Sequence, residues 1–201
     1  ELAVLKDLYD NLNGAEWTTR TNWPTAATWP ANASSAVYGT WYGVTVVDGD
    51  ITAIELPNNN LQGILQSSIG NLTQLTRLVF FDNEIAGSIP SSMGNLTNLK
   101  NLNLYRNNLS GVIPSTIGNL TNLETLELQH NEISGDVPAS INLLDKLNLL
   151  NLADNNLTSM AINGMPELNR LEVQHNNLTQ FPVLIGVPKL KHAYFGGNPQ
   201  I

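Results

Sequence analysis

One nine-residue frame recurs seven times in this 201-residue chain, and it restricts the possible folds more than any other feature. Each copy has an apolar residue, two free positions, an apolar-free-apolar triplet, two more free positions and an asparagine, as in Leu75-x-x-Leu78-x-Phe80-x-x-Asn83. Successive copies begin 24, 24, 24, 24, 21 and 22 residues apart. Such a period indicates a solenoid in which each repeat stacks on its neighbours. The copies begin at Ile51, Leu75, Leu99, Leu123, Leu147, Leu168 and Leu190.

The apolar-free-apolar triplet predicts a short strand, because alternate side chains of a strand point to opposite faces. Its two apolar positions face a core, their neighbours face outward, and the strands of successive repeats form one parallel sheet. The asparagine falls where the chain must turn away from that sheet. Its amide both donates and accepts hydrogen bonds, so we assign it a structural role in the turn. These asparagines are Asn59, Asn83, Asn107, Asn131, Asn155, Asn176 and Asn198.

The first four repeats carry a second signature, as in Leu109-x-Gly111-x-Ile113-Pro114 followed by Ile117-Gly118-Asn119-Leu120. Together the two signatures resemble the plant-type leucine-rich repeat, found in plant receptor ectodomains and in some secreted bacterial and algal proteins. The resemblance implies an α/β leucine-rich repeat solenoid, a right-handed curved superhelix. Its parallel sheet would line the concave face, with a second small sheet at Gly-x-Ile-Pro and short helical turns on the convex face. Repeats five and six lack the glycine and are shorter, which leaves their second sheet open.

Residues 1–50 are interpreted as an N-terminal cap, because a solenoid end exposes apolar core. Residues 51–201 then form seven repeats, the last one partial, in one continuous domain with the cap. Apolar residues at helical spacing from Leu2 to Leu12 predict an amphipathic helix with Gly14 as its C-cap. The dipeptide Asp48-Gly49 predicts a hairpin that pairs with repeat one.

The cap holds all four tryptophans, and two roles are open for them. They can fill the core of the cap, or an aromatic face can accept a sugar ring. The run from Trp41 to Thr45 is similar to a segment of plant caps, but Val46 stands where those caps have a cysteine. This Trp-rich, cysteine-free cap resembles that of secreted bacterial and algal members. The tryptophans are Trp17, Trp23, Trp29 and Trp41.

Charge and composition exclude several classes of partner. A net charge of -8 with a pI near 4.7 leaves no basic stripe for nucleic acid or an anionic membrane surface. No stretch approaches 18 uninterrupted apolar residues, so we expect no membrane insertion. The chain contains no cysteine and begins at Glu1 rather than Met. The lack of cysteine is compatible with a cytosolic or a secreted protein. The start at Glu1 suggests a mature or trimmed fragment, and the plant-type resemblance implies a secreted or cell-surface protein whose signal peptide is not in this chain.

The outward positions of the strands form columns about 4.8 Å apart from strand to strand, and these columns give a map of the concave surface. The map is polar with one aromatic pair near its middle. Exposed aromatic side chains beside arginine and histidine are enriched at binding surfaces, so we expect a ligand here. The candidate ligand-binding residues are Val79, Phe81, Asn103, Tyr105, Arg106, Glu127, His130, Asp154, Glu172 and His175.

The same residues were considered for metal binding and catalysis. His130 and His175 flank Asp154, but two strand spacings put the histidines roughly 10 Å apart, too far for bonds of about 2 Å to one ion. Glu127 and Glu172 mimic a glycosidase carboxylate pair, yet an open concave face offers no pocket that excludes water. Motifs for nucleophilic, nucleotide and zinc-protease chemistry are missing from the sequence. We therefore expect neither catalysis, metal nor cofactor.

Two functional hypotheses follow. The first is a non-enzymatic recognition module that binds a protein, peptide or glycan on the concave face. The alternative is a structural or adhesive spacer of a larger surface protein, or a stalk that associates as a homodimer or larger homo-oligomer. The sequence does not identify the ligand, because a solenoid is a scaffold whose function depends on one surface.

Overall fold

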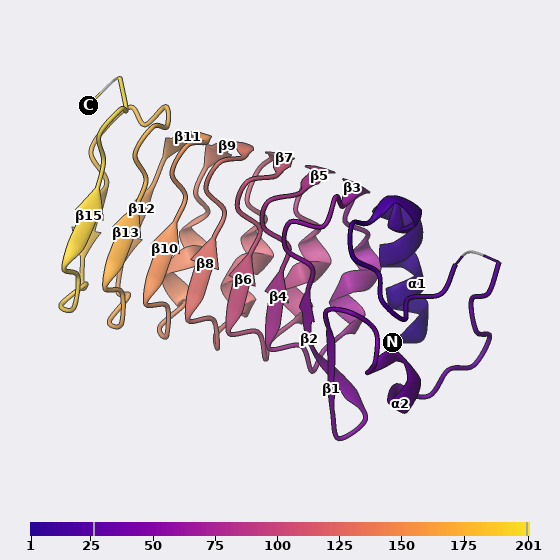
Figure 1. Cartoon of the computed structure of the whole chain (residues 1–201). Helices are drawn as coiled ribbons and strands as arrows, with labels where there is room; N and C mark the ends of the chain where they lie inside the picture. Colours follow the sequence, from indigo (N-terminus) through magenta and orange to yellow (C-terminus); the bar gives the residue numbers. More distant parts are fainter. Residues whose placement is uncertain (26, 200) are drawn as a thin grey trace.

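The main sheet follows the repeats one strand at a time. The computed structural model describes residues 1–25, 27–199 and 201. Its eight-stranded sheet has the order β1-β2-β4-β6-β8-β10-β13-β15, with β1 antiparallel to β2 and all later pairs parallel (Figure 1). This confirms the solenoid fold. The strands are β1 (Val44–Val47), β2 (Asp50–Glu55), β4 (Arg77–Val79), β6 (Asn101–Asn103), β8 (Thr125–Glu127), β10 (Leu149–Asn151), β13 (Arg170–Glu172) and β15 (His192–Tyr194).

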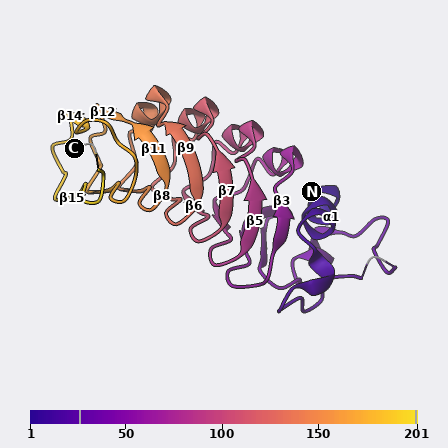
Figure 2. The same cartoon turned by 90° about the horizontal axis from the view of Figure 1, so that it is seen from above.

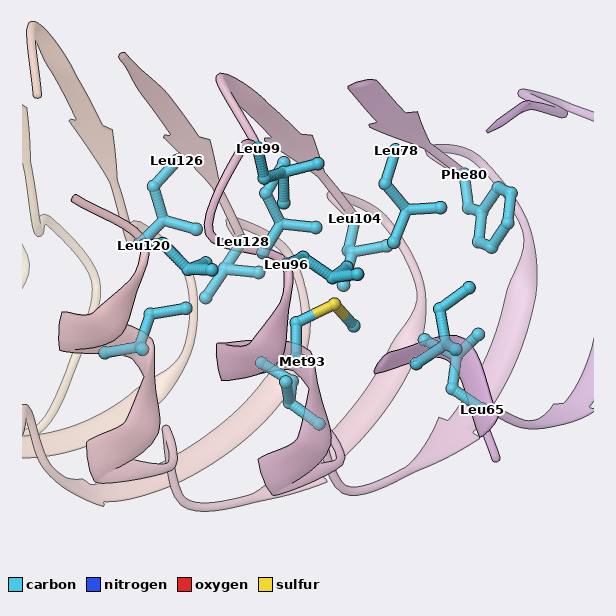
Figure 3. Packing of buried hydrophobic residues seen from close by; sticks show 14 of the residues in the cluster. Leu65, Leu78, Phe80, Met93, Leu96, Leu99, Leu104, Leu120, Leu126 and Leu128 are labelled. Atoms are coloured by element: carbon cyan, nitrogen blue, oxygen red, sulfur yellow. The ribbon is translucent and has the colours of Figure 1, made fainter. Parts of the chain in front are cut away.

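The register of this sheet pairs equivalent positions of the frame. Leu78 pairs with Ile54 on one side and Leu102 on the other, and all three are completely buried. Side chains of the same column pack against leucines that follow the helical turns, and together they fill the interior (Figure 3). Burying one such leucine stabilises the fold by about 1.5–3 kcal/mol. In the last repeat the position is held by Ala193, which is exposed.

Each frame asparagine ties its own turn to the segment before it through its side chain. The side-chain oxygen of Asn107 accepts from the backbone N–H of Ile85 at 2.9 Å, and its amide nitrogen donates to the carbonyls of Phe80 at 2.9 Å and Leu104 at 3.1 Å. The other repeats show the same scheme. At the N-terminal end Asn59 bonds to the backbone of Thr19 in the cap. The structural role predicted for these asparagines is confirmed.

Opposite the main sheet lie a second sheet and a row of short 3-10 helices. The second sheet has the order β11-β9-β7-β5-β3, and the helices lie along the outer side of the curved coil (Figure 2). The strands are β3 (Gln62–Ile64), β5 (Glu84–Gly87), β7 (Asn108–Gly111), β9 (Glu132–Asp136) and β11 (Asn156–Ser159). The helices are η2 (Ser67–Asn71), η3 (Ser91–Asn95), η4 (Ser115–Asn119) and η5 (Ala139–Leu143). Both features expected for repeats one to four are present.

Repeats five and six depart from this plan. Strand β11 of repeat five still joins the second sheet, although its sequence lacks the glycine. In place of further helical turns, β12 (Ala161–Asn163) pairs in parallel with β14 (Val183–Ile185) as a separate two-stranded sheet. The shorter repeats thus replace a helical turn by extended chain, which needs fewer residues to cover the same distance.

The cap begins with helix α1 (Leu2–Asn11), as predicted, but the expected glycine C-cap is wrong. The left-handed residue after the helix is Asn13, with φ 55°, and Gly14 opens the 3-10 turn η1 (Gly14–Glu16). A Cβ on Gly14 would lie 2.2 Å from the ring of Tyr9, so close packing explains this glycine. A short helix α2 (Ser35–Tyr38) precedes the predicted hairpin. The turn of this hairpin has positive φ at Asp48 and Gly49, and the hairpin joins β1 to β2 as predicted.

Three of the tryptophans form the core of the cap. Trp17, Trp23 and Trp41 are buried, and the indole N–H groups of Trp17 and Trp23 donate to backbone carbonyls at 2.7 and 2.8 Å. Because their ring faces are covered, they are unavailable to a sugar. Trp29 is partly buried and lines a cleft of about 750 Å³ together with the first turn of α1. The sugar-stacking hypothesis therefore remains for Trp29 alone.

Candidate ligand-binding surface on the concave sheet

Regular hydrogen bonding fixes the candidate residues beyond the ends of the short strands. The N–H of Phe80 donates to the carbonyl of Asn103 at 2.9 Å, and the N–H of Asp82 donates to the carbonyl of Tyr105 at 3.1 Å. The parallel ladder therefore continues past Val79, where β4 ends. As a result, the aromatic and charged side chains that follow the strands are held on an ordered backbone.

Phe81 and Tyr105 lie side by side on adjacent repeats. Their ring centroids are 4.8 Å apart and the rings are nearly parallel, with an interplanar angle of 3°. The separation equals the spacing of neighbouring strands, so the sheet itself sets the stacking. The guanidinium carbon of Arg106 lies 5.9 Å from the Tyr105 centroid. We call Phe81 and Tyr105 the aromatic ledge.

The column after the ledge is held in an unusual backbone conformation. Six non-glycine residues there have φ between 47° and 54°, the left-handed region, which costs an L-residue roughly 1–2 kcal/mol. Gly197 takes the equivalent place in the last repeat, with φ 71°. Five of the six carry charged or imidazole side chains. The strained backbone positions thus present groups suited to polar contacts. The six are Asn58, Asp82, Arg106, His130, Asp154 and His175.

Two aspartates of this column contact basic or imidazole side chains of neighbouring repeats. Arg106 lies 3.4 Å from a carboxylate oxygen of Asp82. The Nδ1 atoms of His130 and His175 approach the two carboxylate oxygens of Asp154 at 3.5 and 2.9 Å. Within the described part of the chain, no three His, Cys, Asp or Glu side chains are arranged to hold a metal ion. Four of the sequence-predicted residues therefore form one polar row together with Asp82, namely Arg106, His130, Asp154 and His175.

Two predicted surface residues offer little contact area. Val79 and Asn103 point toward the concave side, but they are only 6% and 8% exposed because neighbouring side chains cover them. Asn103 donates its amide to Glu127 at 2.8 Å. Both residues support the surface from below. The exposure predicted for them from the sequence is therefore too high. The alternation of a strand predicts the face to which a side chain points. It does not predict whether side chains of the neighbouring column cover that residue.

The environment of Glu127 shifts the pKa of its carboxyl group. Burial raises the pKa of its carboxyl group, the negative charge of Glu172 raises it further, and a hydrogen bond from Gln129 opposes both. Burial and Asp82 also raise the pKa of Tyr105, whereas Arg106 lowers it. Glu172 itself pairs with Arg170 and accepts from Gln174 at 3.3 Å. These carboxylates are occupied by protein partners.

A polar groove beside the ledge was missed by the sequence analysis. It encloses about 470 Å³ where the cap meets repeats one to three. Thr18 reaches it because the N–H of Thr18 donates to the carbonyl of Asn59 at 3.2 Å. No periodic pattern reveals that contact across 40 residues, although the run Asn58-Asn59-Asn60 indicates a tight turn nearby. The lining residues are Thr18, Asn58, Asn60, Asp82, Asn83, Glu84 and Arg106.

Comparisons with known proteins agree with this architecture. A family model described as leucine rich repeat matches residues 97–157. The crystal structure of a pollen receptor kinase 3 is similar with a TM-score of 0.76 and 22% identity, covering 100% of this chain and 95% of that one. Residues 97–157 therefore contain leucine-rich repeats, and the chain as a whole has the fold of plant leucine-rich repeat ectodomains. No curated protein matches its sequence.

Two further structures similar to this leucine-rich repeat protein contain bound partners. One is the BIR3–SERK2 complex from Arabidopsis thaliana, with a TM-score of 0.70, 24% identity and coverage of 90% of this chain and 96% of that one. The other is the receptor kinase ectodomain GASSHO1/SCHENGEN3 from Arabidopsis thaliana in complex with Casparian strip integrity factor 2. It has a TM-score of 0.61, 21% identity and coverage of 97% and 29%. At these identities the likeness establishes the fold and leaves the ligand open.

Proposed function

We propose that the leucine-rich repeat protein is a non-enzymatic recognition module that binds a protein or peptide through the concave face of repeats two to four. The aromatic ledge of Phe81 and Tyr105, flanked by Arg106 and His130, carries this proposal. Aromatic and arginine side chains dominate the energetics of protein interfaces. The two complexes described above, of proteins with the same fold, support a partner of this class.

We also place the protein outside the cell. Two of the similar structures are ectodomains of plant proteins, which supports this location. None of the helices in the described residues is long and apolar enough to cross a bilayer. A polar concave surface on an acidic chain suits a soluble partner. A glycan is the competing ligand class, and the test below includes it.

The test is to screen the purified chain on peptide and glycan arrays and to measure the affinity of each hit. Phe81→Ala with Tyr105→Ala should remove most of the affinity, because truncating a central aromatic typically costs about 2 kcal/mol or more. The matched control is Val112→Ala with Leu143→Ala, which shortens two exposed apolar side chains away from the concave face. Undiminished binding by the ledge variant would place the site elsewhere, with the cleft at Trp29 next in line.

The non-enzymatic part of the proposal has its own test. Glu127 has the perturbed carboxyl group expected of a general acid, so it is the residue to examine. The chain should show no turnover of polysaccharide substrates. Turnover that Glu127→Gln abolishes would contradict the proposal.

A second candidate function, homo-oligomerisation, is favoured by the C-terminal end of the solenoid. Val183 and Ile185 of the edge strand β14 are each 56% exposed, and Phe181 shortly before it is 65% exposed. Exposed edge strands with apolar side chains readily pair with another chain. Size-exclusion chromatography with light scattering over a concentration series tests it, with Ile185→Lys as the interface variant. A strict monomer at high concentration would count against this candidate.

A further inference from the structure

We propose that the partner segment recognised by the concave surface carries an aromatic side chain close to a lysine or arginine. This inference rests on the proposed function and specifies its ligand. The aromatic side chain packs on the ledge of Phe81 and Tyr105, and the basic side chain enters the polar groove lined by Asp82 and Glu84. The geometry of the ledge supports the first half of the inference, and the charge of the groove supports the second.

The two rings of the ledge are stacked face to face. Two coplanar rings cannot bring their centroids to 4.8 Å without overlap of their hydrogen atoms, so the parallel planes at this distance must face each other. The line between the centroids runs from one repeat to the next, because the residues are equivalent positions of adjacent repeats. The rings therefore stand upright on the sheet and present mainly their edges to a ligand in the concavity.

Edges and faces of aromatic rings select different ligands. A ring edge carries partial positive charge and a ring face partial negative charge, so an edge prefers the face of another aromatic ring. A partner phenylalanine, tyrosine or tryptophan can lie across the two edges in this arrangement. Stacking of a sugar requires an open aromatic face, and in the ledge Phe81 and Tyr105 each cover one face of the other, which leaves one face of each ring. The ledge thus favours an aromatic side chain over a glycan.

The adjoining groove has a surplus of negative charge. Its lining includes the carboxylates of Asp82 and Glu84 and one cation, Arg106. Arg106 approaches Asp82 at 3.4 Å, while Glu84 is exposed and makes no ion pair among the described residues. Asn58 and Asn60 add amide groups to the same lining, and the amide oxygen of Asn60 accepts from Gln62 at 3.0 Å. An ammonium or guanidinium group satisfies this set, whereas a carboxylate is repelled.

The ledge and the groove are close enough for one short segment. Asp82 directly follows Phe81 and Arg106 directly follows Tyr105, so the two features share an edge. An extended chain advances about 3.3 Å per residue, and neighbouring side chains can therefore reach both features. The overall charge of -8 favours the approach of a basic segment over longer distances.

The experiment is a selection from a phage library of random 12-residue peptides on the intact chain, repeated on the ledge variant Phe81→Ala with Tyr105→Ala. Peptides that bind the parent but not the ledge variant should combine Phe, Tyr or Trp with Lys or Arg within three positions. Ledge-dependent peptides without this combination would overturn the inference and leave the proposed function standing. Absence of any ledge-dependent peptide would contradict both.

Charge reversal then tests the groove. Glu84→Lys should weaken a selected peptide about five-fold, and replacing the peptide's basic residue by glutamate should restore binding to that variant. Glu132→Lys is the matched control, because Glu132 opens β9 as Glu84 opens β5 and lies outside the groove. Equal weakening by the two variants, or no rescue by the glutamate peptide, would overturn the assignment of the groove.

Discussion

At the scale of single residues, the solenoid separates two tasks that the sequence places next to each other. Asn107 is buried and completes the hydrogen bonds of three backbone groups. The preceding residue, Arg106, adopts φ 50° and directs a charged side chain to the concave rim. Stability therefore depends on the frame asparagine, whereas the proposed recognition involves the strained residue before it.

Asn107→Ala should destabilise the fold by about 2–4 kcal/mol, because it leaves buried backbone groups without partners at about 1–3 kcal/mol each. The control is Asn108→Ala, which changes the exposed neighbouring residue and should stay within about 0.5 kcal/mol. Chemical denaturation of both variants gives the comparison. Equal free energies of unfolding would show that the asparagine ladder contributes little.

Arg106→Gly should leave the free energy of unfolding unchanged or raise it by up to about 1 kcal/mol, because glycine relieves the left-handed strain. The same change should weaken ligand binding. Thr125→Gly, in the middle of the concave sheet, is the opposite case and should cost about 0.5–1 kcal/mol. A clear loss of stability in Arg106→Gly would argue that its contacts with Asp82 outweigh the strain.

The raised pKa of Glu127 should make the stability of the fold depend on pH. Its pKa is raised in the folded state, so the folded protein binds the proton more tightly than the unfolded chain. This contribution favours folding at low pH and is lost as pH rises from about 4.3, the unfolded value, through the folded value. Relative to the parent chain, the free energy of unfolding of Glu127→Gln should therefore be higher at pH 7 than at pH 3.5. Denaturation curves at both pH values check this, and the reverse order would contradict the assignment.

At the scale of elements, glycines mark where the helical turns of adjacent repeats touch. A Cβ on Gly94 of η3 would lie 2.4 Å from the carbonyl oxygen of Thr116, and Gly70 and Gly118 are equally close to the next turn. The fourth repeat has Asn142 at this position. Its neighbour is strand β12 rather than a helical turn, and the side chain of Asn142 bonds to the backbone of Ala161 and Asn163.

Gly94→Ala should cost about 1–3 kcal/mol, since the added methyl group forces two repeats apart. Gly196→Ala is the control, because nothing lies within 4 Å of its Cβ and its φ is not left-handed. Thermal unfolding should show a lower Tm for the first variant alone. Matching melting temperatures would mean that the turns can separate without penalty.

The elements also show what the sequence could predict. The frame was sufficient for the strands, their register and the asparagine ladder, because each of these depends on contacts repeated at one period. The C-cap at Gly14 failed because a close approach to Tyr9 leaves the same glycine signal as a left-handed turn. Val79 is covered by side chains of other columns, and the groove at Thr18 is formed partly by the cap. Neither contact could be predicted from a local sequence pattern.

At the scale of the whole molecule, the curved stack converts a one-dimensional repeat into one continuous surface. The buried Trp17, Trp23 and Trp41 close its N-terminal end, and the segment around Thr19 completes the asparagine ladder there. The cap thereby contributes to the groove as well as to stability. We propose that recognition takes place on repeats two to four, near that closed end.

Hydrogen–deuterium exchange is the sharpest test of recognition by repeats two to four, with the protein measured alone and saturated with a peptide from the phage selection. New protection should fall on residues 77–84, 101–106 and 125–130, with the convex turns at 91–95 and 115–119 unchanged. Protection confined to the convex turns, to the cleft at Trp29 or to the C-terminal strands would contradict it.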